Sequence, residues 1–96
     1  MFVKQGRIRN ELTSMLYAAQ IRAARILLGW RQEDLANAAE VGLATIHRIE
    51  RQDGIALGAV ATMLALQKAL EKGGVKFLNA DPNGGPGVRW KSTPRA

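Results

Sequence analysis

Two short stretches between residues 32 and 51 carry apolar side chains at the spacing of one helix face. This pattern predicts one helix over residues 32–39 and another over residues 43–51, with a break at residues 40–42. Each predicted helix has only about two to three turns, so neither would be stable alone in water. Two short helices joined by such a turn have the outline of a helix-turn-helix. The apolar positions are Leu35, Ala36 and Ala39 in the first, and Ile46 and Ile49 in the second.

A longer helix is predicted directly before this pair, from Met15 to the residue before Gly29. Glycine suits the left-handed position that closes many helices. Trp30 follows at once, and we expect it to fold back as a lid on the core rather than to lie exposed for stacking. The residues that mark this helix are Leu16, Ile21, Ala24, Ile26, Leu27 and Leu28, with Arg22 and Arg25 on its polar side.

A further helix is predicted after the pair, over residues 59–72. The turn signal Asp53-Gly54 separates it from the pair, and Gly73-Gly74 ends it. We expect this helix to pack on the others through one apolar side. That side is predicted to consist of Val60, Met63, Leu64, Leu66 and Leu70.

The character of the chain changes at residue 75. Residues 75–78 are predicted to form a short strand, and residues 88–91 alternate apolar and basic side chains with the period of two that a strand has. The stretch between them is rich in Asp, Pro, Asn and Gly, which is typical of a loose hairpin loop. A lone two-stranded hairpin is marginal in water, so it must pack on the helices or pair with the same element of a second chain.

Composition limits the class of protein. The chain has 96 residues, enough for one domain, and 47% of them are hydrophobic but only 5% aromatic, which predicts an aliphatic core. No apolar run is long enough to span a membrane, and no secretory signal is visible. The lack of cysteine excludes disulfides and thiolate metal sites, and a single histidine argues against zinc. We therefore expect a cytoplasmic protein without metal or cofactor.

The net charge of +6 is concentrated at the two ends of the chain. Residues 1–14 carry +2 and residues 88–96 carry +3, whereas the seventy-three residues between them carry only +1. A basic protein is expected to bind an anionic partner such as nucleic acid. Basic tails that only aid solubility are the alternative interpretation.

The stretch over residues 21–54 resembles the Cro/C1-type, or Xre-like, helix-turn-helix family of bacterial and phage transcriptional regulators. With the C-terminal hairpin included, the resemblance covers about residues 15–91, as in small single-domain members. It implies a mainly α, lambda-repressor-like helix-turn-helix domain of four to five helices with a short C-terminal β-hairpin. The matching positions are Gly29-Trp30, Gln32, Leu35-Ala36, Val41, Thr45-Ile46 and Ile49-Glu50.

Two departures from the family pattern concern the short helices. Arg31 stands where Ser or Thr usually caps a helix, a loss of about 1 kcal/mol that adds a cation beside any bound phosphate. The turn is Glu40-Val41-Gly42 instead of Gly-Val-Ser. Two outcomes are possible for this turn. Glu40 adopts the left-handed conformation at a cost of about 1–2 kcal/mol, or the turn takes a different shape. Gly42 can still serve as the next N-cap, less well than Ser.

A third departure concerns the start of the chain, because the family's usual beginning aligns near Met15. Residues 1–14 are expected to be an added arm that is flexible or partly helical. The alternative is that the start codon has been assigned too early in the gene. Residues 15–74 are then the helix-turn-helix domain. Residues 75–96 contain the hairpin (75–91) and a basic tail.

The resemblance implies that the second helix of the pair enters the major groove of DNA, with its N-terminal part against base edges. Arg48 can give two hydrogen bonds to guanine, and His47 is either a donor to DNA or solvent-facing. Thr45 has three alternative roles, which are base contact, phosphate contact and helix packing. Gln32 is expected to hold a phosphate and brace the reading helix, and Glu50 to pair with an arginine. The predicted base-reading residues are Leu43, Ala44, Thr45, His47 and Arg48, and the predicted phosphate contacts are Arg31, Gln32 and Arg51.

One reading unit contacts few bases, so we expect a homodimer with recognition helices about 34 Å apart on a palindromic site. Two dimer surfaces are open, the helix over residues 59–72 and the hairpin over residues 75–91. We favour the hairpin, because a twofold partner would cover its strand edges. The predicted dimerisation residues are Val75, Phe77, Val88 and Trp90.

No catalytic constellation is visible in the sequence, and the GGPG loop precedes a strand rather than a phosphate-binding helix. The leading prediction is a non-enzymatic, sequence-specific regulator of double-stranded DNA, most simply a repressor, without membrane contact or small-molecule effector. One alternative is an antitoxin that represses its own operon and holds a toxin with its tail. The other is a protein-interaction module that kept the fold without DNA binding.

Overall fold

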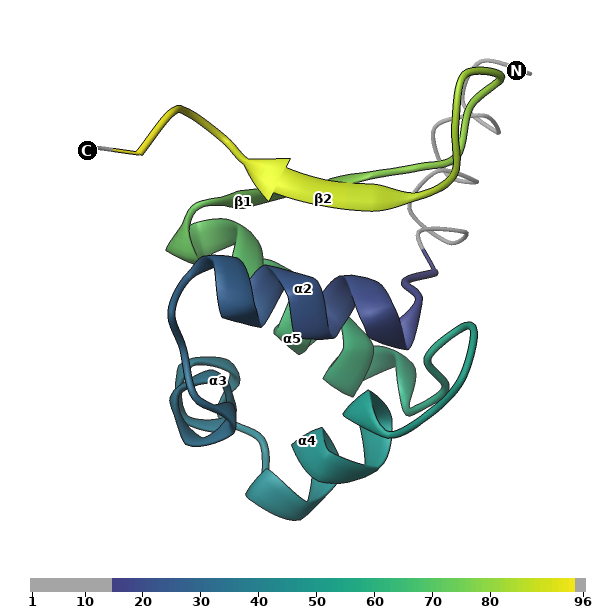
Figure 1. The fold of residues 1–96 in the computed structure, drawn as a ribbon. Helices are drawn as coiled ribbons and strands as arrows, with labels where there is room; N and C mark the ends of the chain where they lie inside the picture. Colours follow the sequence, from purple (N-terminus) through teal and green to yellow (C-terminus); the bar gives the residue numbers. More distant parts are fainter. Residues whose placement is uncertain (1–14, 95–96) are drawn as a thin grey trace, which may run out of the picture.

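The computed structural model describes residues 15–94, which form four helices and one two-stranded sheet (Figure 1). The predicted arm over residues 1–14 lies outside the described residues. The hairpin contacts α2 and α5, and α3 and α4 lie on the other side of α2 (Figure 1). The prediction of a mainly α domain with a C-terminal hairpin is confirmed. The elements are α2 (Ala18–Leu27), α3 (Gln32–Ala39), α4 (Leu43–Glu50), α5 (Val60–Gly73), β1 (Val75–Leu78) and β2 (Gly87–Trp90).

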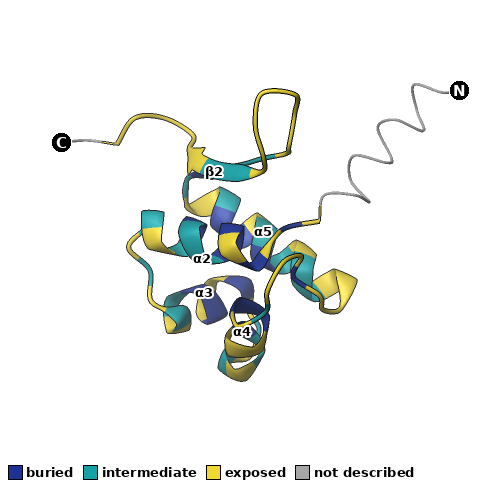
Figure 2. Ribbon diagram, turned by 45° about the vertical axis from the view of Figure 1, so that its right-hand side comes forward, coloured by how far each residue is buried: buried dark blue, intermediate teal, exposed yellow. Residues whose placement is uncertain are grey.

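The core of residues 15–94 is aliphatic, as the scarcity of aromatic residues predicted. Figure 2 shows the buried residues on the inner sides of the four helices. Six of the fourteen buried apolar residues are alanines, and such small side chains let packed helices approach closely. None of the described helices is long and apolar enough to cross a membrane. The buried set is Leu16, Ala18, Ile21, Ala24, Leu35, Ala36, Ala39, Ile46, Ile49, Ala56, Leu66, Ala69, Leu70 and Val75.

Helix α2 begins at Ala18, three residues later than the pattern predicted. The chain before it is extended, because it pairs with the loop that precedes α5. The Ala56 N–H donates to the Leu16 carbonyl at 2.8 Å, and the Ala18 N–H donates to the Gly54 carbonyl at 2.9 Å. These long-range bonds give the backbone polar groups partners that a longer helix would have supplied.

Gly29 ends α2 in the left-handed conformation that was predicted, with φ 70°. Its N–H donates to the Ile26 carbonyl at 2.9 Å, and the Trp30 N–H donates to the Arg25 carbonyl at 3.0 Å. This pair of bonds is a Schellman motif. Trp30 is half-buried against the core, and a Cβ on Gly73 would lie 3.0 Å from two of its ring carbons. The indole is therefore a lid over the C-terminal end of α5, as expected.

The predicted buried side of α5 is only partly right. Leu66 and Leu70 are fully buried and Met63 packs against the core, but Val60 is 74% exposed and Leu64 is 45% exposed. Helix α5 carries two apolar stripes, and only the stripe through Met63, Leu66 and Leu70 faces the other helices. A single helical period in the sequence does not distinguish the two.

The hairpin packs its apolar side chains on its own helices. Val75 pairs with Trp90 and Phe77 with Val88 in the antiparallel register. Val75 is fully buried, Phe77 and Val88 are half-buried against the core, and Trp90 remains 39% exposed. Strand β1 has the predicted bounds, whereas β2 both begins and ends one residue earlier than the predicted range 88–91.

One buried polar side chain joins the hairpin to α2. Gln20 is 6% exposed, and its Nε2 donates to the carbonyls of Leu78 at 3.3 Å and Gly87 at 3.0 Å. Its Oε1 accepts the Tyr17 N–H at 2.8 Å. The amide group therefore has partners on both of its atoms, and it holds the two strands at their loop ends.

Candidate nucleic-acid interface

Helix α3 begins without a side-chain N-cap, as the presence of Arg31 predicted. Arg31 is extended at the cap position, and its N–H donates to Oδ2 of Asp34 at 2.8 Å. Asp34 lies three residues on, where an acidic side chain also interacts favourably with the helix dipole. The carboxylate thus supplies half of a capping box, which offsets part of the missing cap.

The turn between α3 and α4 keeps its left-handed residue although that residue is not glycine. Glu40 has φ 58° and ψ 45°, which is the left-handed conformation. The turn therefore keeps its usual shape, and Glu40 is strained. Its N–H donates to the Asn37 carbonyl at 3.3 Å, and the Val41 N–H donates to the Ala36 carbonyl at 3.0 Å. Val41 also packs against the core, the apolar contact that accompanies a Schellman motif. These contacts hold Glu40 in a conformation that costs about 1–2 kcal/mol.

Helix α4 has a sharp division between its two faces. Gly42 is its extended N-cap, as predicted. Ile46 and Ile49 are fully buried, which fixes the rotation of the helix about its axis. The opposite face is exposed, on the side away from the other helices (Figure 2). We call its residues, which follow the helical spacing i, i+3, i+4 and i+7, the α4 stripe: Ala44, His47, Arg48 and Arg51.

The five predicted base-reading residues are divided by this geometry. Ala44, His47 and Arg48 belong to the α4 stripe. Leu43 is half-buried and packs against the core, and Thr45 is half-buried at the edge of the stripe. The exposed three are therefore better placed to meet a ligand than the other two.

Glu50 is the buried anchor of α4. It is 4% exposed, and its carboxylate takes two hydrogen bonds from Arg25 of α2, Nε to Oε2 at 2.8 Å and Nη2 to Oε1 at 3.0 Å. Arg22 Nη1 donates to the Glu50 backbone carbonyl, and Arg25 Nη1 donates to the Trp30 carbonyl at 2.9 Å. The expected pairing of Glu50 with an arginine is confirmed.

Gln32 completes this anchor from the first residue of α3. Its Nε2 donates to Oε1 of Glu50 at 3.1 Å, so the expected brace between the two short helices is present. One carboxylate thereby joins α2, α3 and α4. Bonds of this charge-assisted kind are stronger than neutral ones, and they fix the angle at which α4 is presented.

The three residues predicted to contact phosphates lie at different depths. The Arg31 side chain is 76% exposed and lies 3.7 Å from the Asp34 carboxylate. Arg51 is exposed at the C-cap of α4. Gln32 is half-buried, with its amide nitrogen directed toward Glu50. The two arginines are thus exposed, one at the start of α3 and one at the end of α4, while the glutamine supports α4 through Glu50.

The charge around α4 is unusual for a surface that meets an anion. Residues 31–53 hold three arginines and five acidic residues, a net charge of −2. Glu50 is neutralised by Arg25, but Glu33 and Glu40 are exposed. Long-range attraction of a polyanion by this segment is therefore weak.

Sequence reasoning missed which arginines would hold Glu50. Arg22 and Arg25 were placed on the polar side of their helix, and no partner was assigned to either. The available signal was their spacing of three residues, which puts both on one helix face, together with a carboxylate at the inner end of α4. The contact itself depends on how α2 crosses α4, which periodicity does not encode.

A family model described as helix-turn-helix matches residues 21–74, more than half of the chain. The match spans α2 from its fourth residue through the end of α5. It therefore contains the α4 stripe, the Glu50 anchor and the Glu40 turn. No curated protein matches the chain.

Proposed function

The chain belongs to the Cro/C1-type helix-turn-helix family of DNA-binding transcription regulators, and on that premise we propose that it is a dimeric repressor of a palindromic operator. The observation that carries the proposal is the α4 stripe, an exposed helix face held at a set angle by the buried Glu50 anchor. In this family the second helix of the pair enters the major groove. Repression requires only that the bound protein occupies its site.

Base reading is assigned to the three exposed residues near the middle of α4. Arg48 gives two hydrogen bonds to O6 and N7 of guanine, the commonest specific contact. Ala44 meets the methyl group of a thymine, and His47 donates to a base edge or an adjacent phosphate. Leu43 and Thr45 contribute less to base reading than these three residues, because both are half-buried.

Phosphate contacts are assigned to Arg31 at the start of α3 and to Arg51 at the end of α4. The ion pair of Arg31 with Asp34 is exposed and longer than a hydrogen bond, so it stabilises little and releases Arg31 at small cost. Gln32 donates to a phosphate oxygen with the second N–H of its Nε2, supported by its place at the start of α3. Such contacts fix register without reading sequence.

Fluorescence anisotropy with duplexes selected from a random pool tests the proposal. We expect tight binding of a selected palindrome, weaker binding of random duplex, and a log–log salt slope that grows with the number of phosphates contacted. The selected site gives the half-site and its spacing directly. Absence of any duplex binding at low salt would refute the proposal.

A protein-interaction module is the second candidate, and the net charge of −2 over residues 31–53 favours it. Such a module would bind duplexes with almost no dependence on salt. The same titration therefore separates the two functions. An antitoxin that represses its own operon remains a form of the DNA-binding proposal, distinguished by co-purification of a toxin.

A further inference from the structure

The outer face of the hairpin is basic. Successive residues of a strand point to opposite faces, and the apolar side chains of both strands take the face that packs on the core. Lys76 and Arg89 therefore point outward, and both are exposed. The Lys91 N–H donates to the Gly74 carbonyl at 2.9 Å, so the strand pairing continues past β2 and Lys91 shares the outer face. We call these three exposed cations, Lys76, Arg89 and Lys91, the basic face.

Two members of the basic face repel each other. Lys76 lies directly opposite Arg89 in the antiparallel register, and like charges in such a pair destabilise a sheet. Within residues 15–94, no carboxylate forms an ion pair with any member of the basic face. Residues 75–94 hold three basic residues and one acidic residue, a net charge of +2. An anion bound across the pair would replace the repulsion by attraction.

Further polar groups lie at the end of the hairpin. A shallow hollow of about 440 Å³ is found there, and its lining includes Arg89, Lys91, Ser92 and Thr93. Arginine and lysine side chains and hydroxyl groups are common donors to phosphate oxygens. The end of the hairpin thus presents charged and neutral donors together, a combination that suits phosphate groups.

We propose that the basic face binds the phosphate backbone of double-stranded DNA, as a second contact surface separate from the α4 stripe. The hairpin and α4 lie on opposite sides of the molecule, with α2 between them (Figure 1). A straight duplex in contact with α4 therefore does not reach the basic face. One copy of the chain holds two duplex segments, one read by α4 and the other held without regard to sequence. This bridging rests on the proposed function, whereas binding at the basic face does not.

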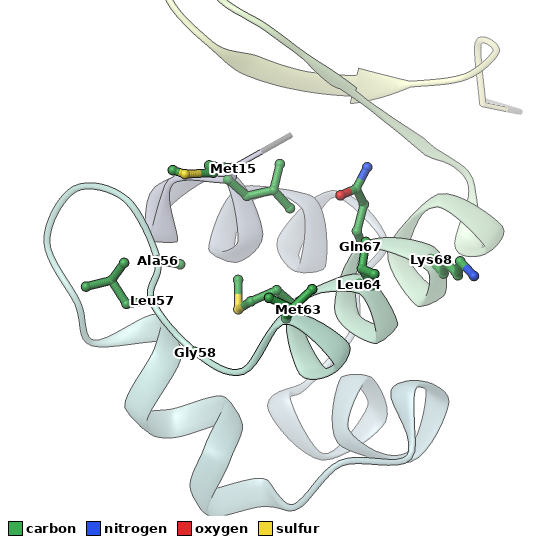
Figure 3. Close-up of a pocket in the computed structure, with 10 residues that line it drawn as sticks. Met15, Ala56, Leu57, Gly58, Met63, Leu64, Gln67 and Lys68 are labelled. Carbon is green, nitrogen blue, oxygen red and sulfur yellow. The ribbon is translucent and has the colours of Figure 1, made fainter. Parts of the chain in front are cut away.

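The basic face does not have the apolar centre that a protein partner needs. Its one apolar neighbour on the outer side of the hairpin strands is Leu78, which is half-buried. Contiguous apolar surface lies elsewhere, in a groove of about 610 Å³ between the chain before α2, the loop before α5 and the first half of α5 (Figure 3). The basic face therefore fits a ligand that is recognised by its charge.

A single strand of nucleic acid is the competing ligand, because Trp90 also borders the hollow and is 39% exposed. Single strands are bound by stacking their bases on aromatic side chains. Trp90, however, pairs with the buried Val75, so its side chain lies on the inner side of the hairpin, away from the basic face. A duplex needs no stacking, and it carries about one negative charge per 1.7 Å of its axis. The geometry thus favours the duplex.

A capture experiment tests the inference with the full chain. An operator selected from a random pool is immobilised and loaded with protein, and a labelled random duplex is then added. The natural chain should retain the labelled duplex. At equal protein load, a variant with Lys76→Gln and Arg89→Gln should retain roughly tenfold less, because it has lost two phosphate contacts. Circular dichroism checks that the variant is folded.

The matched control removes the same charge from another surface. Lys68 and Lys72 are exposed on α5, and a variant with Lys68→Gln and Lys72→Gln should retain the labelled duplex as the natural chain does. Equal retention by the two double variants and the natural chain would overturn the inference. So would an equal loss for both, which would indicate an effect of net charge alone.

Trp90→Leu separates the two kinds of nucleic acid. It keeps the basic face intact, so retention of the duplex should stay within about twofold of the natural value. A loss as large as that of the Lys76→Gln and Arg89→Gln variant would overturn the assignment to a duplex. Tighter retention of a labelled single strand of the same length would overturn it too.

Failure of the basic face is distinguishable from failure of the proposed function. Anisotropy with random duplex, in a chain carrying Arg31→Ala and Arg51→Ala, reports on the basic face without the phosphate contacts beside α4. Adding Lys76→Gln and Arg89→Gln to this chain should lower the log–log salt slope by about two. If that slope falls but no operator can be selected, only the proposed function is refuted. If an operator is bound but no second duplex is retained, only the basic face is refuted.

Discussion

Arg25 of α2 holds Glu50 of α4 through two parallel hydrogen bonds, at 2.8 and 3.0 Å, in a place where the carboxylate is almost fully shielded from water. A bidentate pair fixes orientation as well as distance. The angle of the α4 stripe is therefore set from the far side of the helix, by a residue on another element. Changes at this pair therefore act on the α4 stripe through the fold.

Replacing Glu50 by Ala should lower the free energy of unfolding by about 3–5 kcal/mol, because it leaves the arginine charge half-buried without its partner. Urea denaturation followed by circular dichroism measures the loss. Glu33→Ala, at an exposed position on α3, is the control and should change stability by less than about 0.5 kcal/mol. The double variant Arg25→Met with Glu50→Leu should recover much of the loss. A loss below about 1 kcal/mol for Glu50→Ala would contradict the anchor role.

Replacing Glu40 by Gly should raise the free energy of unfolding by about 1 kcal/mol, because glycine adopts φ 58° without steric strain. Thermal and urea unfolding both measure the gain. Glu40→Ala removes the same carboxylate but keeps a Cβ in the left-handed conformation, so it should bring little change. Equal gains from both variants would mean that charge, and not backbone strain, is the cause.

Replacing Arg48 by Ala should weaken binding to the selected operator by about 1–3 kcal/mol and binding to random duplex only slightly. Arg48 is exposed, so stability should not change. Arg31→Ala is the contrasting variant: it should weaken both duplexes alike and reduce the salt slope by about one. Anisotropy titrations at several salt concentrations distinguish the patterns. Equal losses on both duplexes for Arg48→Ala would remove it from the base-reading set.

Replacing Gly73 by Ala should destabilise the fold by about 1–3 kcal/mol, although alanine is the better helix former. The new Cβ would lie 2.7 Å from Cδ1 of Leu28 and 3.0 Å from the Trp30 ring. The control is Gly85→Ala in the hairpin loop, where a Cβ meets nothing within 4 Å. Comparing the melting temperatures of the two variants with that of the natural protein tests this prediction. If both melt alike, the indole lid is not as closely packed on α5 as the structure places it.

Local signals in the sequence predicted the helix-turn-helix well. Gly29 adopts the positive φ that its position in the pattern suggested, and the turn predicted at Asp53-Gly54 follows the end of α4. The spacing of Ile46 and Ile49 identified the inner face of α4, and with it the outer face. These features depend on neighbours within one turn of the chain, so the sequence carries them directly.

Long-range features escaped prediction. The start of α2 depends on pairing with residues 54–56, and the choice between the two stripes of α5 depends on where the other helices lie. Leu64 looks as apolar as Leu66 in the sequence, yet one lines an open groove and the other is fully buried. The partners of Glu50 likewise follow from the crossing of α2 and α4. Periodicity within one element contains no information on such crossings.

Gln20 has a consequence for how the molecule opens. Its amide binds the backbone of Tyr17 and of both strands at once, so lifting the hairpin leaves a buried amide without acceptors, a loss of about 1–3 kcal/mol. Val75 would be stripped from the core in the same step. The amide protons of β1 and β2 are therefore expected to exchange with solvent at the rate of α2. The hairpin is not a detachable tail but part of one cooperative unfolding unit with the helices that carry the α4 stripe.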